Sequence, residues 1–303
     1  MSLFSFRPVS RIRRFFVIAA LLLGGCEQSP QPPAAKLLVV TSIAPLSMLV
    51  REVAGDDMEI RQLVNSGDPH QYAPKVADRA AMERAALVVW MGPAMEAVLA
   101  RQMSQLPAEK ALSLLAAGGY EYDGADPQDP HLWLRPRNAA LMAAHIASKL
   151  AVLDPSAADA YRQRARNFSR AMANLQKVQD RALWAYRDVP IVSTHTAYGQ
   201  FFGPAGVNVT SLGTSASHQH GARAMLEKVA PAAGGEGPRG CLFGEVPAND
   251  RDRQTAEHLN LDYQALDPLG TGLPATADYR ALMERLLADA RKCLGKIPDT
   301  GSE

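Results

Sequence analysis

Apolar runs of strand length alternate with segments of helical spacing over most of the chain. In the first half, buried strands are predicted at residues 37–41, 58–64 and 87–91, and helices at residues 46–53, 79–86 and 95–105. In the second half, strands are predicted at residues 190–194, 207–212, 240–245 and 261–266, and helices at residues 221–230, 250–259 and 277–292. Strands that alternate with helices are typical of βαβ units, whose strands form parallel sheets. We therefore expect an α/β protein with two lobes, each a parallel sheet flanked by helices.

The middle of the chain interrupts this alternation, because residues 138–153 and 156–187 contain no convincing strand. In the second of these pieces an apolar residue returns every seven positions, at Tyr161, Phe168, Leu175 and Ala182. This stripe predicts one helix of roughly 30 residues, about 45 Å long, which would join the two lobes rigidly. The expected organisation is an N-terminal lobe at residues 36–137, a linking helix region at residues 138–188 and a C-terminal lobe at residues 189–303.

The first 25 residues have the layout of a secretory signal peptide. A basic segment with Arg7, Arg11, Arg13 and Arg14 precedes an apolar stretch at residues 15–23. That stretch is too short to span a membrane. Leu23-Gly24-Gly25-Cys26 resembles the cleavage box of bacterial lipoproteins, which implies a lipid on Cys26 and a polar tether at residues 26–35. The alternative is an ordinary cleaved signal with an incidental cysteine. We expect a periplasmic or extracytoplasmic lipoprotein anchored to a membrane.

Removal of the signal peptide reverses the sign of the net charge. Residues 1–25 hold four of the 32 Lys and Arg residues and none of the 31 Asp and Glu residues, so 28 basic residues remain against 31 acidic ones. No basic excess is left to favour nucleic acid as a partner.

With Cys26 assigned to lipid, Cys241 and Cys293 form an even pair in a chain predicted to enter an oxidising compartment. We expect a disulfide between them, which would stabilise the C-terminal half by roughly 4 kcal/mol in the chain-entropy model. The alternative is two buried free thiols.

Four residues form a candidate metal site. Asp-Pro-His occurs twice, ending at His70 and at His131, while His195 follows the strand predicted at residues 190–194 and Asp267 follows that at 261–266. Three imidazoles and one carboxylate match the ligands that zinc prefers. Ligands in open α/β sheets gather outside the carboxyl ends of strands, and these residues come from both halves of the chain. One ion bound by all four would therefore lie in the cleft between the lobes.

The prolines in the two repeated motifs favour stiff turns before each histidine. Asp68 and Asp129 then have two possible roles. One is to orient a histidine by accepting its second ring N–H, and the other is to form the turn.

Several motifs, in this order, resemble those of the bacterial zinc- and manganese-binding proteins of ABC uptake transporters, also called solute-binding protein family 9. The motifs are Leu38-Val39-Val40-Thr41-Ser42-Ile43-Ala44-Pro45, Gly67-Asp68-Pro69-His70-Gln71-Tyr72-Ala73-Pro74, Leu87-Val88-Val89-Trp90-Met91-Gly92-Pro93, Asp129-Pro130-His131-Leu132-Trp133-Leu134, Ser193-Thr194-His195-Thr196-Ala197-Tyr198-Gly199 and Leu266-Asp267-Pro268-Leu269-Gly270. The match covers about residues 36–295 and is most similar to the zinc-uptake branch, which also tends to carry a cysteine pair at these positions.

The resemblance implies a binding protein, not an enzyme, that captures Zn²⁺ as cargo and delivers it to an ABC transporter permease. It assigns the metal ligands to His70, His131, His195 and Asp267. Manganese-binding relatives carry a carboxylate in place of His195, and imidazole suits zinc or copper better than manganese. We therefore expect Zn²⁺ before Mn²⁺ or Cu²⁺, and a monomer.

The chain departs from this family in one segment. The zinc-binding relatives often insert a histidine- and acid-rich loop between the first two ligands, but residues 120–128 are acidic and contain no histidine. The other close pair, His218 and His220, precedes a predicted helix and is either a secondary metal-capture site or a solvated helix entrance.

A zinc hydrolase is the alternative function. In it, His70, His131 and His195 would bind zinc, water would fill the fourth position, and Glu245 or Asp267 would act as general base. No HExxH helix supports this alternative. Glu245 is equally suited to orient a ligand or to close the lobes.

Overall fold

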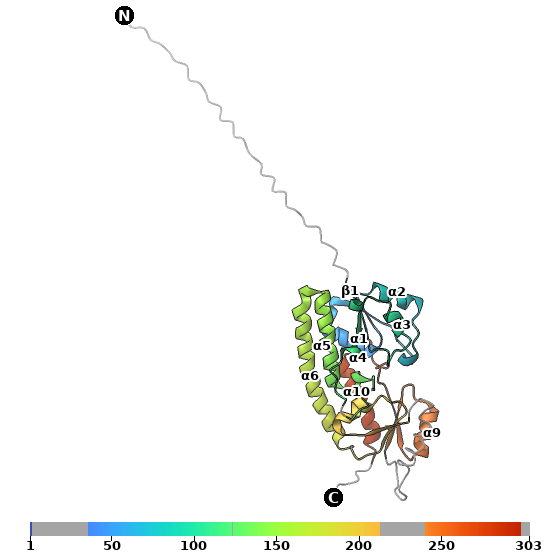
Figure 1. Ribbon diagram of the computed structural model, residues 1–303. Coiled ribbons are helices and arrows are strands. Elements are labelled where there is room, and N and C mark those ends of the chain that lie inside the picture. The colour runs from blue at the N-terminus through green and yellow to red at the C-terminus, as the bar shows by residue number, and fades with distance from the viewer. Residues whose placement is uncertain (2–35, 123, 213–239, 298–303) are drawn as a thin grey trace. The chain divides into compact units, whose positions relative to one another are not determined.

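The computed structural model describes residue 1 and residues 36–122, 124–212 and 240–297. The signal peptide, the tether with Cys26, the pair His218 and His220 and the helix predicted at residues 221–230 lie outside these ranges. The described residues from 36 onward belong to one compact unit, and Figure 1 labels many of its helices.

Two four-stranded parallel sheets form the framework, as the alternating pattern predicts. The first sheet has the order β2-β1-β3-β4, with β1 at Leu37–Thr41, β2 at Met58–Gln62, β3 at Leu87–Trp90 and β4 at Ala111–Ser113. The second has the same order, β6-β5-β7-β8, with β5 at Ile191–Ser193, β6 at Val209–Ser211, β7 at Cys241–Glu245 and β8 at Asp262–Leu266. In both sheets the first strand in the chain is central. The second strand pairs with it on one side, and the third strand pairs with it on the opposite side. The carboxyl ends of the central strands are therefore the places where loops diverge and ligands bind.

Helices flank the sheets. In the first half they are α1 at Ala44–Ala54, α2 at Val76–Arg84, α3 at Ala100–Met103 and α4 at Leu114–Ala117. In the second half they are α7 at Gly199–Phe202, α9 at Asp250–His258 and α10 at Tyr279–Leu294. Short 3₁₀ turns lie at Gly55–Asp57 (η1), Pro69–Gln71 (η2), Ala108–Lys110 (η3), Leu132–Leu134 (η4), Pro155–Ala157 (η5) and Gly203–Ala205 (η6).

The two sheets are bridged by a pair of helices, α5 at Pro136–Leu153 and α6 at Ala158–Trp184, which pack side by side (Figure 1). Helix α6 contacts α1 beside the first sheet and η6 and α10 beside the second, so it is the long linking helix that the sequence predicts. The turn ahead of the helix is capped by the Asp154 side chain, which accepts the N–H groups of Ser156 and Ala157.

The buried stripe of α6 follows the predicted repeat at Tyr161, Phe168 and Leu175 but then shifts to Gln179 and Leu183 instead of Ala182. An α-helix has 3.6 residues per turn, so a strict seven-residue repeat drifts by about 20° per heptad. Over the length of α6 this drift moves the buried face by one position.

One predicted helix is shorter in the structure, and one strand was not predicted. The helix expected at residues 95–105 is reduced to α3, because the Glu96 side chain accepts the N–H groups of Met91 and Gly92 and fixes a tight turn ahead of it. Strand β4 is absent from the prediction, since its three residues are too few to give a recognisable pattern.

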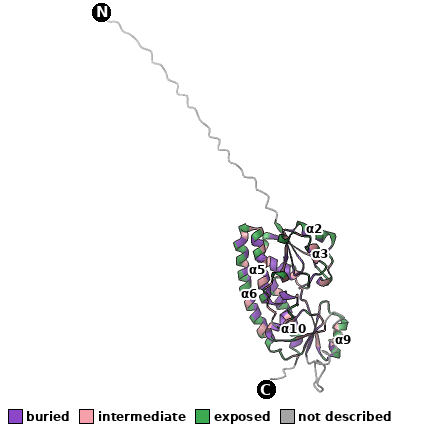
Figure 2. Ribbon diagram, in the orientation of Figure 1, coloured by how far each residue is buried: buried purple, intermediate pink, exposed green. Residues whose placement is uncertain are grey.

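One hydrophobic core spans both sheets and the helix pair, and a small cluster lies under α9. Figure 2 shows buried residues along the inner side of α5 and α6 and exposed ones along the outer side of α6. Cys241 and Cys293 form the predicted disulfide, which joins the start of β7 to the end of α10 across 52 positions of sequence. Among the described residues, no helix combines the length and apolarity needed to cross a bilayer.

Candidate metal centre

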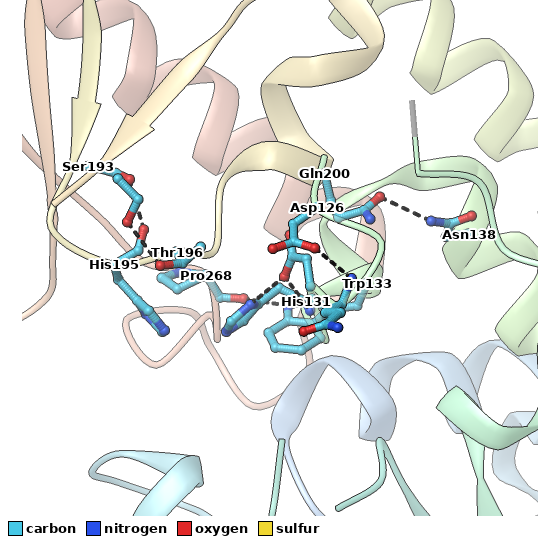
Figure 3. Close-up of polar contacts among 12 residues, drawn as sticks. Asp126, His131, Trp133, Asn138, Ser193, His195, Thr196, Gln200 and Pro268 are labelled. Atoms are coloured by element: carbon cyan, nitrogen blue, oxygen red, sulfur yellow. Dashed lines mark hydrogen bonds and ion pairs between the residues drawn. The ribbon is translucent and has the colours of Figure 1, made fainter. Parts of the chain in front are cut away.

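Three of the four predicted ligands come together. One side-chain nitrogen from each of His70, His131 and His195 lies within 4.8 Å of the others. The ring centroids are 5.5 Å apart for His70 and His131, 5.4 Å for His70 and His195, and 4.7 Å for His131 and His195. Figure 3 shows the rings of His131 and His195 directed towards the same space. His70 follows β2 and His195 follows β5, so the group joins residues that belong to different sheets.

His131 is buried and held in one orientation. Asp129 Oδ1 accepts the backbone N–H of His131 at 2.9 Å and lies 2.7 Å from its ring Nδ1. The His131 ring also packs against Trp133, with ring centroids 5.3 Å apart. With Nδ1 bonded to a carboxylate, Nε2 is the nitrogen left to bind a metal. Asp129 thus fulfils both predicted roles, orienting the ring and forming the turn.

His195 has an equivalent partner from a distant part of the chain. Glu245 Oε1, at the end of β7, lies 2.7 Å from His195 Nδ1. Burial lowers the pKa of His195, but the hydrogen bond and charge of Glu245, together with the charges of Asp68 and Asp129, outweigh burial and raise the pKa above its ordinary value. Glu245 therefore orients the His195 ring, as one of the roles considered for it requires.

His70 is less constrained. Asp68 Oδ1 accepts the backbone N–H of His70 at 2.9 Å, and Asp68 Oδ2 accepts from Gln71 Nε2 at 3.1 Å. These bonds form the η2 turn and do not orient the ring, so the turn role is the one that applies to Asp68. Burial, followed by the neighbouring His131 and His195, lowers the pKa of His70.

Asp267 is not a member of the compact group of three. Its Oδ2 accepts the Thr271 hydroxyl at 3.2 Å and the Gly272 N–H at 2.8 Å. The carbonyl of the next residue, Pro268, accepts the Trp133 Nε1–H at 2.9 Å (Figure 3). This hydrogen bond connects the segment that contains Asp267 to the segment that contains His131. A cavity of about 160 Å³ is lined both by residues 64–67, before His70, and by residues 269–271, after Asp267.

Three potential ligand atoms are buried without a hydrogen-bond partner in the described part of the chain. They are His70 Nε2, His131 Nε2 and Asp267 Oδ1. A buried polar atom that lacks a partner costs about 1–3 kcal/mol, so such atoms are rare in folded proteins. A cation bound among the three histidines would satisfy His70 Nε2 and His131 Nε2, and imidazole donors fit zinc.

The remaining histidines of the described chain lie away from this group. His145 Nε2 contacts the Gly118 carbonyl at 3.2 Å, and His258 ends α9. Glu121, in the acidic segment that lacks histidine, forms ion pairs with Arg135, just before α5, and with Arg137 in its first turn. Sequence reasoning missed the bond between Trp133 and Pro268, and no local pattern signals it.

Two parallel-sheet lobes bridged by helices, with a histidine cluster drawn from both, define a two-lobed metal-binding protein of the solute-binding type. The family model of ZnuA, the periplasmic zinc-uptake complex component A, matches residues 39–293. The chain belongs to this family, which confirms the resemblance seen in the motifs.

Individual relatives agree with this assignment. The high-affinity zinc uptake system protein ZnuA of Yersinia pestis is 27% identical over 294 residues, which cover 86% of this chain and 92% of the relative. The zinc-binding lipoprotein AdcA of Streptococcus pneumoniae is 26% identical over 198 residues, but these span 60% of this chain and only 39% of AdcA. The periplasmic zinc-binding protein TroA of Treponema pallidum has the same fold, with a TM-score of 0.71 at 18% identity over 86% of this chain and 99% of TroA. None of these relatives supports the hydrolase alternative.

Proposed function

We propose that this protein binds Zn²⁺ outside the cytoplasm and delivers it to the permease of an ABC transporter. His70, His131 and His195 would bind the ion through Nε2 and Asp267 through Oδ1. The observation that carries the proposal is the cluster of three imidazoles whose nitrogens lie within 4.8 Å of one another, two of which, His70 Nε2 and His131 Nε2, are buried without a partner. Four protein ligands leave no open coordination position, which favours tight holding over catalysis.

The orienting carboxylates support zinc as the cargo. Asp129 and Glu245 keep the proton on Nδ1 of their histidines, so Nε2 is free to coordinate without prior rearrangement. Three imidazoles suit zinc better than manganese, which prefers oxygen ligands. Copper binds nitrogen ligands more strongly than zinc does. The availability of each metal, rather than the set of ligand atoms, would therefore select zinc over copper.

We further propose that residues 1–25 are cleaved, that Cys26 is lipidated, and that residues 26–35 tether a single copy of the protein to the membrane. The lobes would span residues 36–137 and 189–303, with residues 138–188 as the linking region. Mass spectrometry of the exported protein tests the anchor. It should find diacylglycerol on Cys26, whereas Cys26→Ser should release the protein from the membrane.

Metal titration of the chelated protein tests the site, by calorimetry with a competing chelator. Wild type should bind one zinc ion tightly, and His195→Ala and Asp267→Ala should each weaken binding by about 10-fold or more. His258→Ala at the end of α9 is the matched control and should bind like wild type. Unchanged affinity in Asp267→Ala would remove the carboxylate from the ligand set, and unchanged affinity in both variants would refute the proposed site.

A further inference from the structure

Helix α6 carries a row of exposed basic side chains on its outer face. Arg166, Arg170, Lys177 and Arg181 are all exposed, and Trp184 continues the row at the end of the helix with 57% of its surface accessible. Their spacing of three, four or seven positions places them on one side of an α-helix. We refer to Arg166, Arg170, Lys177 and Arg181 as the basic stripe.

The charges of the basic stripe are not neutralised by acidic neighbours in the described chain. Arg166 donates to Gln163 Oε1 at 2.6 Å and Arg170 to Asn167 Oδ1 at 2.5 Å, and both acceptors are neutral amides. The described residues place no carboxylate within 4.0 Å of any stripe member, whereas Arg162 on an adjacent face pairs with Asp159 at 3.2 Å.

The helix pair also differs in charge from the rest of the protein. Helices α5 and α6 contain eight Lys and Arg residues and two Asp and Glu residues. The remainder of residues 26–303 contains 20 Lys and Arg residues against 29 Asp and Glu residues. Such an asymmetry directs one side of the molecule towards an anionic surface.

The end of the stripe has the chemistry of a membrane interface. The Arg187 guanidinium lies 3.9 Å from the ring centroid of Trp184, which leaves the other ring face accessible to a partner. Val178 on the same helix is 56% exposed. An aromatic ring beside basic side chains suits the boundary between headgroups and acyl chains.

The described fold also begins next to this helix. Leu37 at the start of β1 pairs with Met58 in β2, and the preceding Asp57 forms an ion pair with Arg164 of α6 at 3.1 Å. A chain anchored at Cys26, as proposed above, would therefore enter the fold beside the first turns of α6. The anchor would hold the basic stripe near the bilayer at high effective concentration.

We propose that the basic stripe, with Trp184 at its end, binds the headgroups of an anionic phospholipid bilayer. Each Lys or Arg near such a surface contributes through attraction to the negative surface potential, and Trp184 inserts at the headgroup level. The proposed zinc ligands all lie outside α5 and α6, so this inference does not depend on zinc binding and the two can be tested separately.

The test measures vesicle binding by the chain without its first 26 residues, which retains the whole compact unit from residue 36 onward. Vesicles contain phosphatidylcholine alone or with one quarter phosphatidylglycerol, at low and high salt. One variant carries Arg170→Gln, Lys177→Gln and Arg181→Gln, and the matched control carries Arg79→Gln, Arg84→Gln and Arg101→Gln, three exposed residues of the first lobe. Zinc affinity of each variant is measured in parallel and should equal that of wild type.

Wild type and control should bind the anionic vesicles, and the stripe variant should bind on the order of 10- to 100-fold more weakly. High salt should weaken binding, because it screens exposed charges. Trp184 fluorescence should shift to shorter wavelength on binding, since Trp90 and Trp133 are already buried and do not report on this surface. No binding, equal loss in both triple variants, or equal binding to neutral vesicles would each overturn the proposal.

Discussion

Glu245 Oε1 lies 2.7 Å from His195 Nδ1, although the two residues are 50 positions apart in the sequence. The bond joins the end of β7 to the loop after the neighbouring strand β5. It fixes which nitrogen of His195 faces His70 and His131. The order of strands in the sheet, not the local motif around His195, therefore brings the orienting carboxylate to this histidine.

Loss of the Glu245 carboxylate should weaken zinc binding. Glu245→Ala removes both the charge and the hydrogen bond, and we expect a 10- to 100-fold loss of affinity, the range typical of residues that orient metal-binding histidines. Glu245→Gln can still accept from Nδ1–H and should lose less. Glu257→Gln on exposed α9 controls for the loss of one negative charge. Equal affinities in chelator competition for Glu245→Ala and wild type would show that Glu245 does not orient His195.

Zinc affinity should fall as the pH falls. Imidazole binds metal only when neutral, and the pKa of His195 is raised by Glu245 while that of His70 is lowered by burial and its neighbours. On acidification His195 is therefore protonated before His70, and affinity should begin to decline at a pH above about 6.5, the ordinary value for histidine. In Glu245→Gln the decline should begin at lower pH. A titration series at constant ionic strength measures both curves, and coincident curves would contradict this assignment.

The Cys241–Cys293 disulfide should stabilise the fold without contributing to the metal centre. It joins the start of β7 to the end of α10, whereas Glu245 lies at the opposite end of β7. We expect replacement of both cysteines by serine to cost about 2–5 kcal/mol of unfolding free energy in urea. Zinc affinity measured well below the unfolding midpoint should stay within about 3-fold of wild type, which is roughly 0.6 kcal/mol. A larger loss of affinity would mean that the disulfide also determines the geometry of the site.

Helix α6 should contribute to stability through its inner face only. Phe168 is buried against Tyr279 of α10, with ring centroids 5.7 Å apart, so Phe168→Ala should cost about 3–5 kcal/mol. Val178→Ala on the exposed face is the control and should change stability by no more than about 0.5 kcal/mol. Chemical denaturation of both variants measures the difference, and similar values would argue against α6 bracing the second lobe.

Much of the secondary structure follows from local pattern. The apolar runs at residues 37–41 and 87–91 become β1 and β3, and the stripe from Tyr161 to Leu175 becomes the buried face of α6. These elements can be predicted because side chains point to the same face every two positions in a strand and every 3.6 positions in a helix. The prediction was wrong for residues 95–105 and missed β4, where the Glu96 turn and a strand of only three residues leave no periodic signal.

By itself, the sequence determined the α/β class, the linking helix, the cysteine pair and the identity of the candidate ligands, because each depends on residue type and on neighbours within a few positions. Only the tertiary structure decided that His70, His131 and His195 lie together and that Glu245 orients His195. It also decided that Trp133 bonds to Pro268, 135 positions away. These contacts join residues brought together by the order of strands and the packing of two lobes around shared helices. No local periodicity encodes that arrangement.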